Sequence, residues 1–116
     1  MRKPFIKSLN QIEIEGAYGG SGRRQLILSK DDPVSSQMQA MTKWYLAPNG
    51  IFDRHNHEGI DEFFIVTEGN GVITFEDGTS FEYHKDDCIY IPADINHTIE
   101  NTGDIENEFF FIRINQ

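Results

Sequence analysis

Three histidines and a glutamate form the pattern in this sequence that could do chemistry. His55 and His57 are two residues apart, and side chains at that spacing point to the same face of an extended strand. Glu62 follows after Gly59, where the chain can turn and bring the carboxylate back toward the two imidazoles. His97 lies farther along, after a strand end that contains proline. Three imidazoles and a carboxylate suit one divalent ion of Mn, Fe, Co, Ni, Cu or Zn.

Each of these residues is a weak signal when taken alone. Two exposed loop histidines often occur by chance, and Glu58 and Asp61 compete with Glu62 for the role of carboxylate ligand. The remaining histidine, His84, precedes a short acidic run, and we interpret both as solvated turn residues. Only the joint pattern therefore predicts a site.

The elements that must position these residues are short strands. Six segments are rich in aromatic and β-branched residues and are bounded by Gly, Pro, Asn and Asp. No apolar period of helical length is present, and only residues 31–37 suggest a weak helical turn. The Asn-Gly and Asp-Gly pairs at 70–71 and 77–78 predict tight hairpin turns. The six predicted strands are 25–29, 41–47, 62–68, 71–77, 88–92 and 108–114.

This organisation predicts one all-β domain over residues 1–116, with antiparallel strands that close into a barrel or a two-sheet roll. Strand alternation turns Trp44 inward if Lys43 faces solvent, and Phe64 inward if Glu62 does. Arg113 is left open. Inward, it would anchor a substrate carboxylate or phosphate; outward, it is one charge near the end of the chain, and outward or rim placement is favoured.

Composition limits the function classes. The 116 residues carry a formal net charge of −9, which disfavours nucleic acid and anionic membranes as partners. No apolar run has the length of a signal peptide or of a membrane-spanning helix. Cys88 is the single cysteine, so it forms no intrachain disulfide, and we expect it to be a small buried side chain. Together these features predict a cytoplasmic protein.

The spacing of the candidate ligands resembles the cupin superfamily, in which a first motif reads G-x5-H-x-H-x3,4-E-x6-G and a second reads G-x5-P-x-G-x2-H-x3-N. The chain departs from these patterns at three glycine positions, where it has Asn49, Asp86 and Asp94. Asn and Asp are the residues after glycine that best tolerate a positive φ, so the turns are expected to persist. The positions that match the two motifs are His55, His57, Glu62 and Gly69, and Pro92, His97 and Asn101.

The resemblance implies a double-stranded β-helix, or jelly-roll barrel, that holds one divalent transition metal. It implies a metal-dependent enzyme acting on a small organic molecule by dioxygenase, isomerase, decarboxylase or lyase chemistry, with no catalytic residue identified. A metal-containing module that binds a sugar or a small carboxylic acid is the alternative, and a structural protein of the seed-storage type is the third possibility. A tentative substrate pocket comprises Trp44, Phe64 and Arg113. The strand that carries Glu62 is apolar on both faces, and the family implies a homodimer that covers it.

Overall fold

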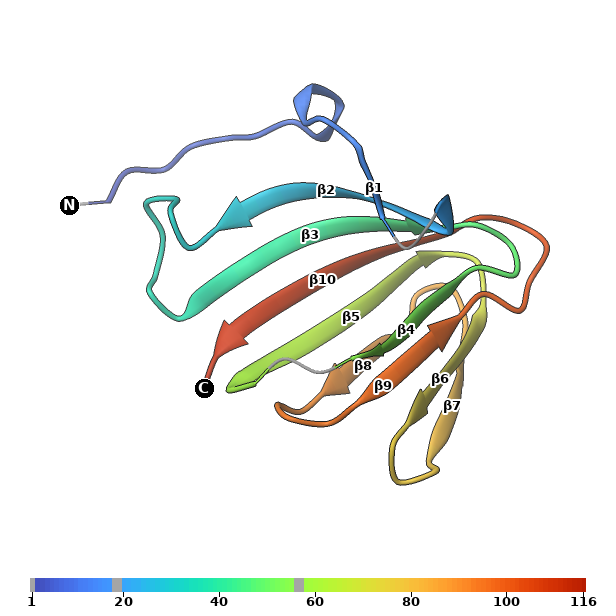
Figure 1. The fold of residues 1–116 in the computed structure, drawn as a ribbon. Helices are drawn as coiled ribbons and strands as arrows, with labels where there is room; N and C mark the ends of the chain where they lie inside the picture. Colours follow the sequence, from blue (N-terminus) through green and yellow to red (C-terminus); the bar gives the residue numbers. More distant parts are fainter. Residues whose placement is uncertain (1, 18–19, 56–57) are drawn as a thin grey trace.

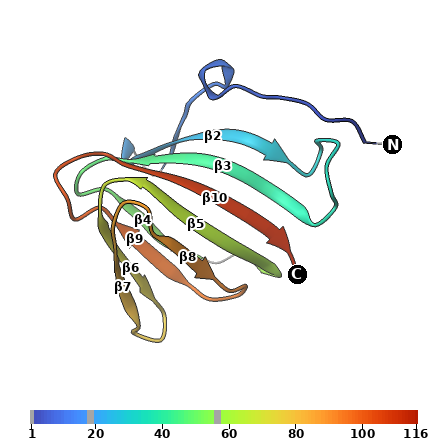
Figure 2. The same ribbon diagram turned by 180° about the vertical axis from the view of Figure 1, so that it is seen from behind.

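The chain folds into two antiparallel β-sheets that face each other and enclose the core (Figure 1). The computed structural model describes residues 2–17, 20–55 and 58–116, and the side chains of Arg54 and His55 fall outside the description. The larger sheet has the strand order β1-β2-β3-β10-β5-β8, and the smaller sheet has the order β4-β9-β6-β7. Seen from behind, the two sheets lie close together at one end of the molecule and diverge toward the other end (Figure 2).

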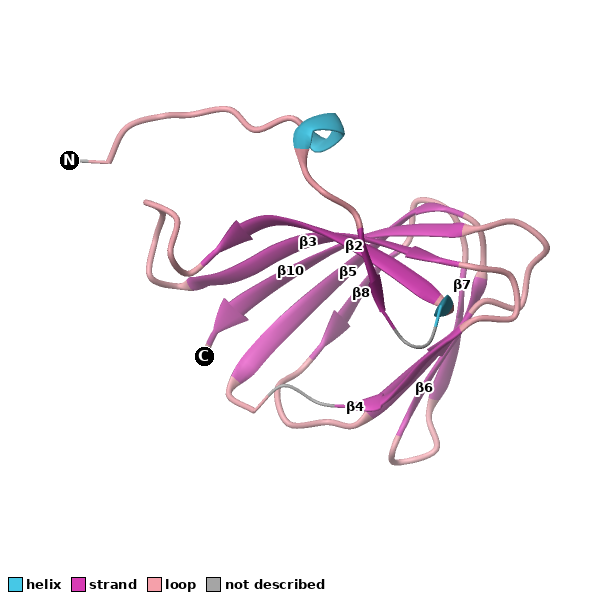
Figure 3. Cartoon of the chain, turned by 45° about the horizontal axis from the view of Figure 1, so that its top comes forward, coloured by secondary structure: helices cyan, strands magenta, loops and turns pink. Residues whose placement is uncertain are grey.

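The strands of the larger sheet are β1 (Glu15–Ala17), β2 (Gly22–Ser29), β3 (Met38–Leu46), β5 (Ile60–Glu68), β8 (Cys88–Ile91) and β10 (Asn107–Asn115). Those of the smaller sheet are β4 (Ile51–His55), β6 (Gly71–Phe75), β7 (Ser80–Tyr83) and β9 (His97–Glu100). A 3₁₀ turn, η1 (Leu9–Gln11), precedes β1 and stands apart from the sheets in Figure 3.

Alternating burial along the long strands places the core between the sheets. In β5, every second residue from Glu62 to Val66 is buried, as the period of a strand requires. Aromatic rings fill the centre, where Phe64 stacks on Phe111 with ring centroids 5.0 Å apart. Offset and edge-on aromatic packing of this kind adds to the stabilisation from buried apolar area. The buried apolar set comprises Trp44, Leu46, Phe52, Phe64, Val66, Ile73, Phe75, Tyr83, Ile89, Ile91, Ile99, Phe109 and Phe111.

The fold confirms the predicted all-β, antiparallel jelly-roll class, and each of the six predicted strands corresponds to an observed one. The helical turn predicted over 31–37 is wrong, since those residues form turns and bends. The hairpin predicted at 70–71 is also wrong. There the chain leaves β5 in the larger sheet and enters β6 in the smaller one, so the turn is a corner between sheets. The turn at 77–78 does close a hairpin, between β6 and β7.

Two side-chain placements also differ from the prediction. Lys43 lies on the outer face of the sheet, yet only 8% of it is exposed, because it packs 4.4 Å from the centroid of the Phe110 ring. Cys88 is exposed rather than buried. No helix in the described part of the chain is long and apolar enough to cross a membrane. The cytoplasmic location stays a prediction.

Candidate metal centre

Two of the four predicted ligands meet between the sheets. Glu62 projects inward from β5 of the larger sheet, and His97 projects inward from the start of β9 of the smaller sheet. The Nε2 atom of His97 lies 3.8 Å from Oε1 of Glu62, and each side chain is only 1% exposed. Main-chain pairing of β4 with β9 sets His55 directly opposite His97. The side chain of His55 and the whole of His57 lie outside the described residues.

A hydrogen bond fixes the orientation of the His97 ring. Nδ1 lies 3.2 Å from the carbonyl oxygen of Ile95. A carbonyl can only accept, so Nδ1 carries a proton and the ring directs Nε2 toward Glu62. Histidine ligands of metals are commonly held by this kind of contact to a backbone carbonyl.

The carboxylate of Glu62 is also held by an arginine. Arg113 stands opposite Glu62 in the register of β10 and β5. Its Nε donates a hydrogen bond of 2.6 Å to Oε2 of Glu62, and its side chain is 16% exposed. The guanidinium therefore points inward, and the outward or rim placement favoured by the sequence is not what the structure shows. A charged donor at this distance makes a strong hydrogen bond and offsets the cost of burying the carboxylate.

The two acidic residues that compete with Glu62 face elsewhere. Glu58 is exposed. Asp61 accepts a hydrogen bond of 3.0 Å from the main-chain N–H of Ala93. Nearby, Asp94 accepts one of 3.0 Å from the N–H of Gly59. These reciprocal bonds tie the loop before β5 to the loop before β9, and they leave Glu62 as the buried carboxylate at this end of the barrel.

Residues 42–113 match the Cupin domain family, a range that begins within β3, contains the whole of β5 and ends at Arg113 in β10. This chain belongs to the cupin family.

Similar proteins differ in how much of their length this cupin covers. An Oxalate-binding protein of Thermotoga maritima is 27% identical over 103 residues, which span 87% of this chain and 84% of that protein. An uncharacterised protein of Methanocaldococcus jannaschii is 41% identical over 51 residues, which span 44% of this chain and only 40% of that protein. A crystal structure described as a predicted oxalate decarboxylase of Thermotoga maritima superposes with a TM-score of 0.87 at 23% identity, covering 97% of this chain and 100% of that one. That likeness shows the fold.

Cupins commonly hold a divalent metal, and the described donors fit one. Two atoms bound to the same ion at about 2.1 Å each lie at most ~4.2 Å apart, and Nε2 of His97 and Oε1 of Glu62 satisfy this limit. Both atoms are buried. The described residues contain no group of three or more His, Cys, Asp or Glu side chains that could hold a metal ion. The imidazoles of His55 and His57 lie outside that description.

The predicted pocket residues separate into three roles. Trp44 lies on the inner face of β3 with 5% exposure, and its indole N–H donates to Oγ1 of Thr42 at 2.9 Å. Phe64 is 0% exposed and belongs to the aromatic core, so it presents no surface to a ligand. Arg113 reaches the buried carboxylate. The sequence did hold a partial signal for Arg113, because strand alternation puts it on the same face of β10 as Phe109 and Phe111, so an inward face would carry all three.

Proposed function

We propose that this cupin binds one divalent transition metal and acts on a small organic acid. The buried cluster of Glu62, His97 and Arg113 is the observation that supports the proposal. It combines two metal-type donors with a cation in a site that excludes water. The donor set suits Fe, Mn, Ni, Zn, Co or Cu. The proposed metal ligands are His55, His57, Glu62 and His97.

Arg113 would bind the carboxylate of the ligand. Arg113 holds Glu62 through Nε, and a guanidinium carries two further nitrogens that can donate to an anion. A guanidinium matches a carboxylate with two parallel hydrogen bonds, which a neutral sugar cannot accept in the same way. The cation therefore favours a small acid over a sugar as the ligand.

A small dicarboxylate is the substrate class that we infer. The Oxalate-binding protein of Thermotoga maritima aligns with 87% of this chain. Oxalate is small enough for an interior crowded by Trp44 and Phe111, whose ring centroids are 6.3 Å apart. One carboxylate can be held by Arg113 while the other faces the proposed ligands.

The protein side chains would orient the acid and exclude water from it. Glu62 is fixed by Arg113, and His97 is fixed by the carbonyl of Ile95, so both donors are preorganised before a ligand arrives. A bound metal would supply Lewis-acid polarisation of the acid or activation of dioxygen. The proposed reaction classes are those of a dioxygenase, an isomerase, a decarboxylase or a lyase.

A binding module without turnover is the second candidate, and one observation favours it. Within the described part of the chain, Glu62 and His97 are the buried carboxylate and the buried imidazole, and both are assigned to the metal. Arg113 stays protonated at any ordinary pH. No further buried carboxylate or imidazole is therefore left among the described residues to act as a general acid or base.

Metal analysis of the purified chain tests the site. We expect about one ion per chain in the wild type and in His84→Ala, since His84 is an exposed residue whose ring lies beside Asp87. His57→Ala and Glu62→Gln should fall well below that ratio. Equal metal content in all four proteins, or none in the wild type, would contradict the proposed ligands.

Ligand binding and turnover are measured on the Mn, Fe, Co, Ni and Zn forms. Oxalate should bind at least about tenfold more weakly to Arg113→Lys than to the wild type, while Arg23→Lys, on the outer face, should bind normally. Release of formate or carbon dioxide from oxalate would identify an enzyme. Tight binding without product in every metal form would identify the module.

Three further features remain proposals. The homodimer would cover the apolar outer face of the larger sheet. The absence of nucleic-acid and membrane partners rests on the acidic charge. The cytoplasmic location rests on the single cysteine and on composition.

A further inference from the structure

Two hydrogen bonds tie the start of β5 to the loop that leads into β9. In that loop, Oδ1 of Asp94 accepts a hydrogen bond of 3.0 Å from the main-chain N–H of Gly59. In the opposite direction, Oδ1 of Asp61 on β5 accepts one of 3.0 Å from the N–H of Ala93. Each segment thus provides one carboxylate acceptor and one main-chain donor. Two such bonds fix the relative position of the segments, whereas a single bond would allow them to pivot.

The tied segments carry the two described donors of the proposed metal site. Glu62 directly follows Asp61 on β5, and the loop before β9 ends at His97, the first residue of that strand. The carbonyl oxygen of Ile95, the residue after Asp94, lies 3.2 Å from Nδ1 of His97. A shift of this loop would therefore move both the imidazole and the carbonyl that orients it.

Gly59 receives a further hydrogen bond next to the strand that carries Arg113. The main-chain N–H of Gln116 donates to the carbonyl of Gly59 at 3.0 Å, immediately after β10. On β10 itself, Arg113 donates to Glu62 at 2.6 Å. In the sequence, Gly59 stands two positions after His57 and three before Glu62. Through its own N–H and C=O, this glycine therefore joins the three chain segments that carry Glu62, His97 and Arg113.

Asp94 makes its bond at a position where the resembled motif has glycine, which has no side chain that could accept. Its φ is 69°, a left-handed conformation that glycine adopts freely and that aspartate tolerates. Asp86 offers a comparison within the chain. It also replaces a motif glycine, has φ 76° and is exposed, as Asp94 is. Asp86 precedes β8 and Asp94 follows it, so the two aspartates lie at opposite ends of that strand.

We propose that Asp94 and Asp61 are positioning residues that hold His97 at coordination distance from Glu62. The inference rests on the proposed function, because it concerns the same metal site. Both carboxylates act through the main chain, at Gly59 and at the residue before Asp94, rather than as ligands.

The distance between the two donors makes the site sensitive to this loop. One ion spans donors at most ~4.2 Å apart, and Nε2 of His97 lies 3.8 Å from Oε1 of Glu62. That leaves roughly 0.4 Å before a single ion no longer reaches both atoms. A loop that drifts farther has to be brought back when the ion binds, and this cost weakens binding.

Titration of the metal-free chain with Co²⁺, followed by visible absorption, tests the role of Asp94. Asp94→Gly removes the acceptor and keeps a backbone that suits the left-handed φ. We expect it to raise the dissociation constant for Co²⁺ at least about tenfold and to change the shape of the absorption spectrum. Asp94→Asn keeps an oxygen acceptor and removes only the charge, so it should bind Co²⁺ as the wild type does. Asp61→Ala should weaken binding as Asp94→Gly does, because it breaks the second bond.

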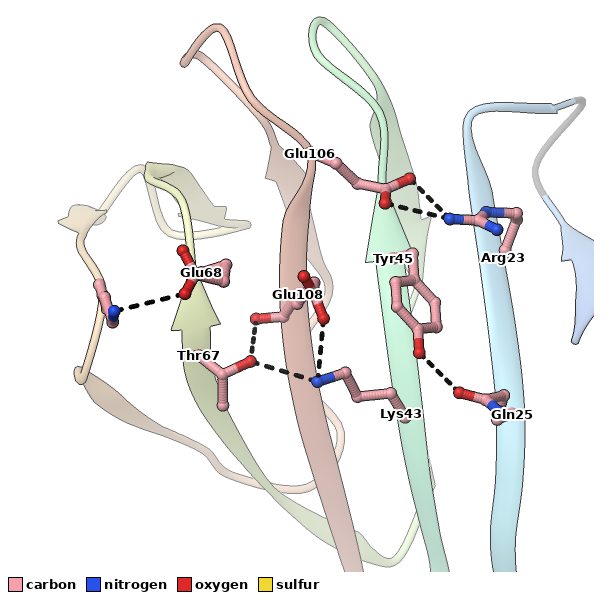
Figure 4. Close-up of polar contacts among 9 residues, drawn as sticks. Arg23, Gln25, Lys43, Tyr45, Thr67, Glu68, Glu106 and Glu108 are labelled. Carbon is pink, nitrogen blue, oxygen red and sulfur yellow. Dashed lines mark hydrogen bonds and ion pairs between the residues drawn. The ribbon is translucent and has the colours of Figure 1, made fainter. Parts of the chain in front are cut away.

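Two controls separate positioning from a general loss of stability. Asp86→Gly makes the same substitution at a similar φ and should leave the dissociation constant for Co²⁺ unchanged. Thr67→Val removes a hydroxyl that donates to the carbonyl of Glu108 at 3.1 Å on the outer face of the larger sheet (Figure 4). Thr67 is five positions from Glu62 along β5, or about 17 Å away. This variant should unfold at a lower urea concentration and still bind Co²⁺ like the wild type.

Amide hydrogen exchange gives a readout that needs no metal. The N–H of Gly59 should exchange at least about tenfold faster in metal-free Asp94→Gly than in Asp94→Asn or Asp86→Gly, because only the first variant loses the acceptor. Equal exchange rates in the three variants would show that Asp94 does not hold the loop, and they would overturn the inference.

The Co²⁺ titration can also overturn the inference while the metal site stands. It would do so if Asp94→Gly bound Co²⁺ as tightly as the wild type, or if Thr67→Val or Asp86→Gly lost as much affinity as Asp94→Gly. An equal loss in Asp94→Asn would assign the effect to charge rather than to the hydrogen bond, which also contradicts positioning. A wild type that binds no Co²⁺ would instead contradict the proposed function, and the inference with it.

Discussion

At the scale of single residues, the ion pair of Glu62 and Arg113 determines which charges lie inside the barrel. Oε2 of Glu62 accepts from Arg113, and Oε1 faces His97. The guanidinium therefore stabilises the ionised carboxylate, the form that a metal requires. The same cation is aimed at any acid that enters. One arginine thus serves both the proposed metal site and the proposed ligand site.

Replacement of Arg113 by methionine should lower the free energy of unfolding of the chelator-treated protein by about 3 kcal/mol, because a buried carboxylate loses its cation. Arg23→Met removes an ion pair whose side chains are 46% and 40% exposed, and it should cost at most about 1 kcal/mol. Urea unfolding of both variants measures the difference. Equal losses would show that the interior pair contributes no more than a surface one.

Tyr83 makes stability depend on alkaline pH. Burial raises the pKa of its hydroxyl above the ordinary value of 10.0, and the hydroxyl donates to Oδ1 of Asn107 at 2.6 Å. The folded state therefore retains the proton after the unfolded state has lost it. The stability gained from this is complete below about pH 10 and is lost as the pH rises further.

The free energy of unfolding should consequently fall by about 1.4 kcal/mol per pH unit from Tyr83 alone once the pH exceeds about 10. Tyr83→Phe removes that contribution, so its unfolding free energy should decline less steeply between about pH 9 and about pH 11. Burial also raises the pKa of Tyr45 and Tyr90, so some slope remains in the variant. Parallel curves for the two proteins would rule out ionisation of Tyr83 as the cause.

At the scale of elements, turn chemistry was predictable where one residue sets the conformation. Asn49, Asp86 and Asp94 have φ angles of 65°, 76° and 69°, in keeping with their places at glycine positions of the resembled motifs. At the first of these turns the sequence had left open whether Asn49 or Gly50 takes the positive φ, and it is Asn49. The corner at 68–71 was not predictable from its Asn-Gly pair. Its positive φ is at Gly69 instead, since the chain must change sheets there rather than reverse beside its own strand.

Two glycines with the same φ separate backbone strain from crowding. Gly69 and Gly78 both have φ 89°. A Cβ at Gly78 would meet no atom within 4 Å, whereas one at Gly69 would collide with the side-chain amide of Asn107. Gly78→Ala should therefore cost about 1–2 kcal/mol of stability, and Gly69→Ala about 3 kcal/mol or more. Guanidinium unfolding measures the loss of stability in each variant. Equal losses would mean that the side chain of Asn107 moves aside freely.

At the scale of the whole molecule, the sequence specified the class of fold better than the site. Long alternating strands such as β5 and β10 were recognisable from their period. The short strands β7 and β9 have four residues each and lack the run of apolar residues that marked β8, which is equally short, so they were not distinguished from loops. Arg113 was misplaced for a related reason. Its partner Glu62 lies 51 positions away, and only the pairing of β5 with β10 brings them together.

Metal binding should be visible in the stability of the whole chain. A metal that binds the folded state alone stabilises it by about 2.7 kcal/mol when present at 100 times its dissociation constant, which raises the Tm of a domain of this size by roughly 10 °C. Adding the metal to chelator-treated wild type or His84→Ala should produce this shift, and Glu62→Gln should show little of it. The variant retains the volume of the side chain beside Arg113 and His97, so a lost shift reports the carboxylate rather than a cavity. An equal rise in Tm for Glu62→Gln would mean that the ion binds elsewhere on the molecule.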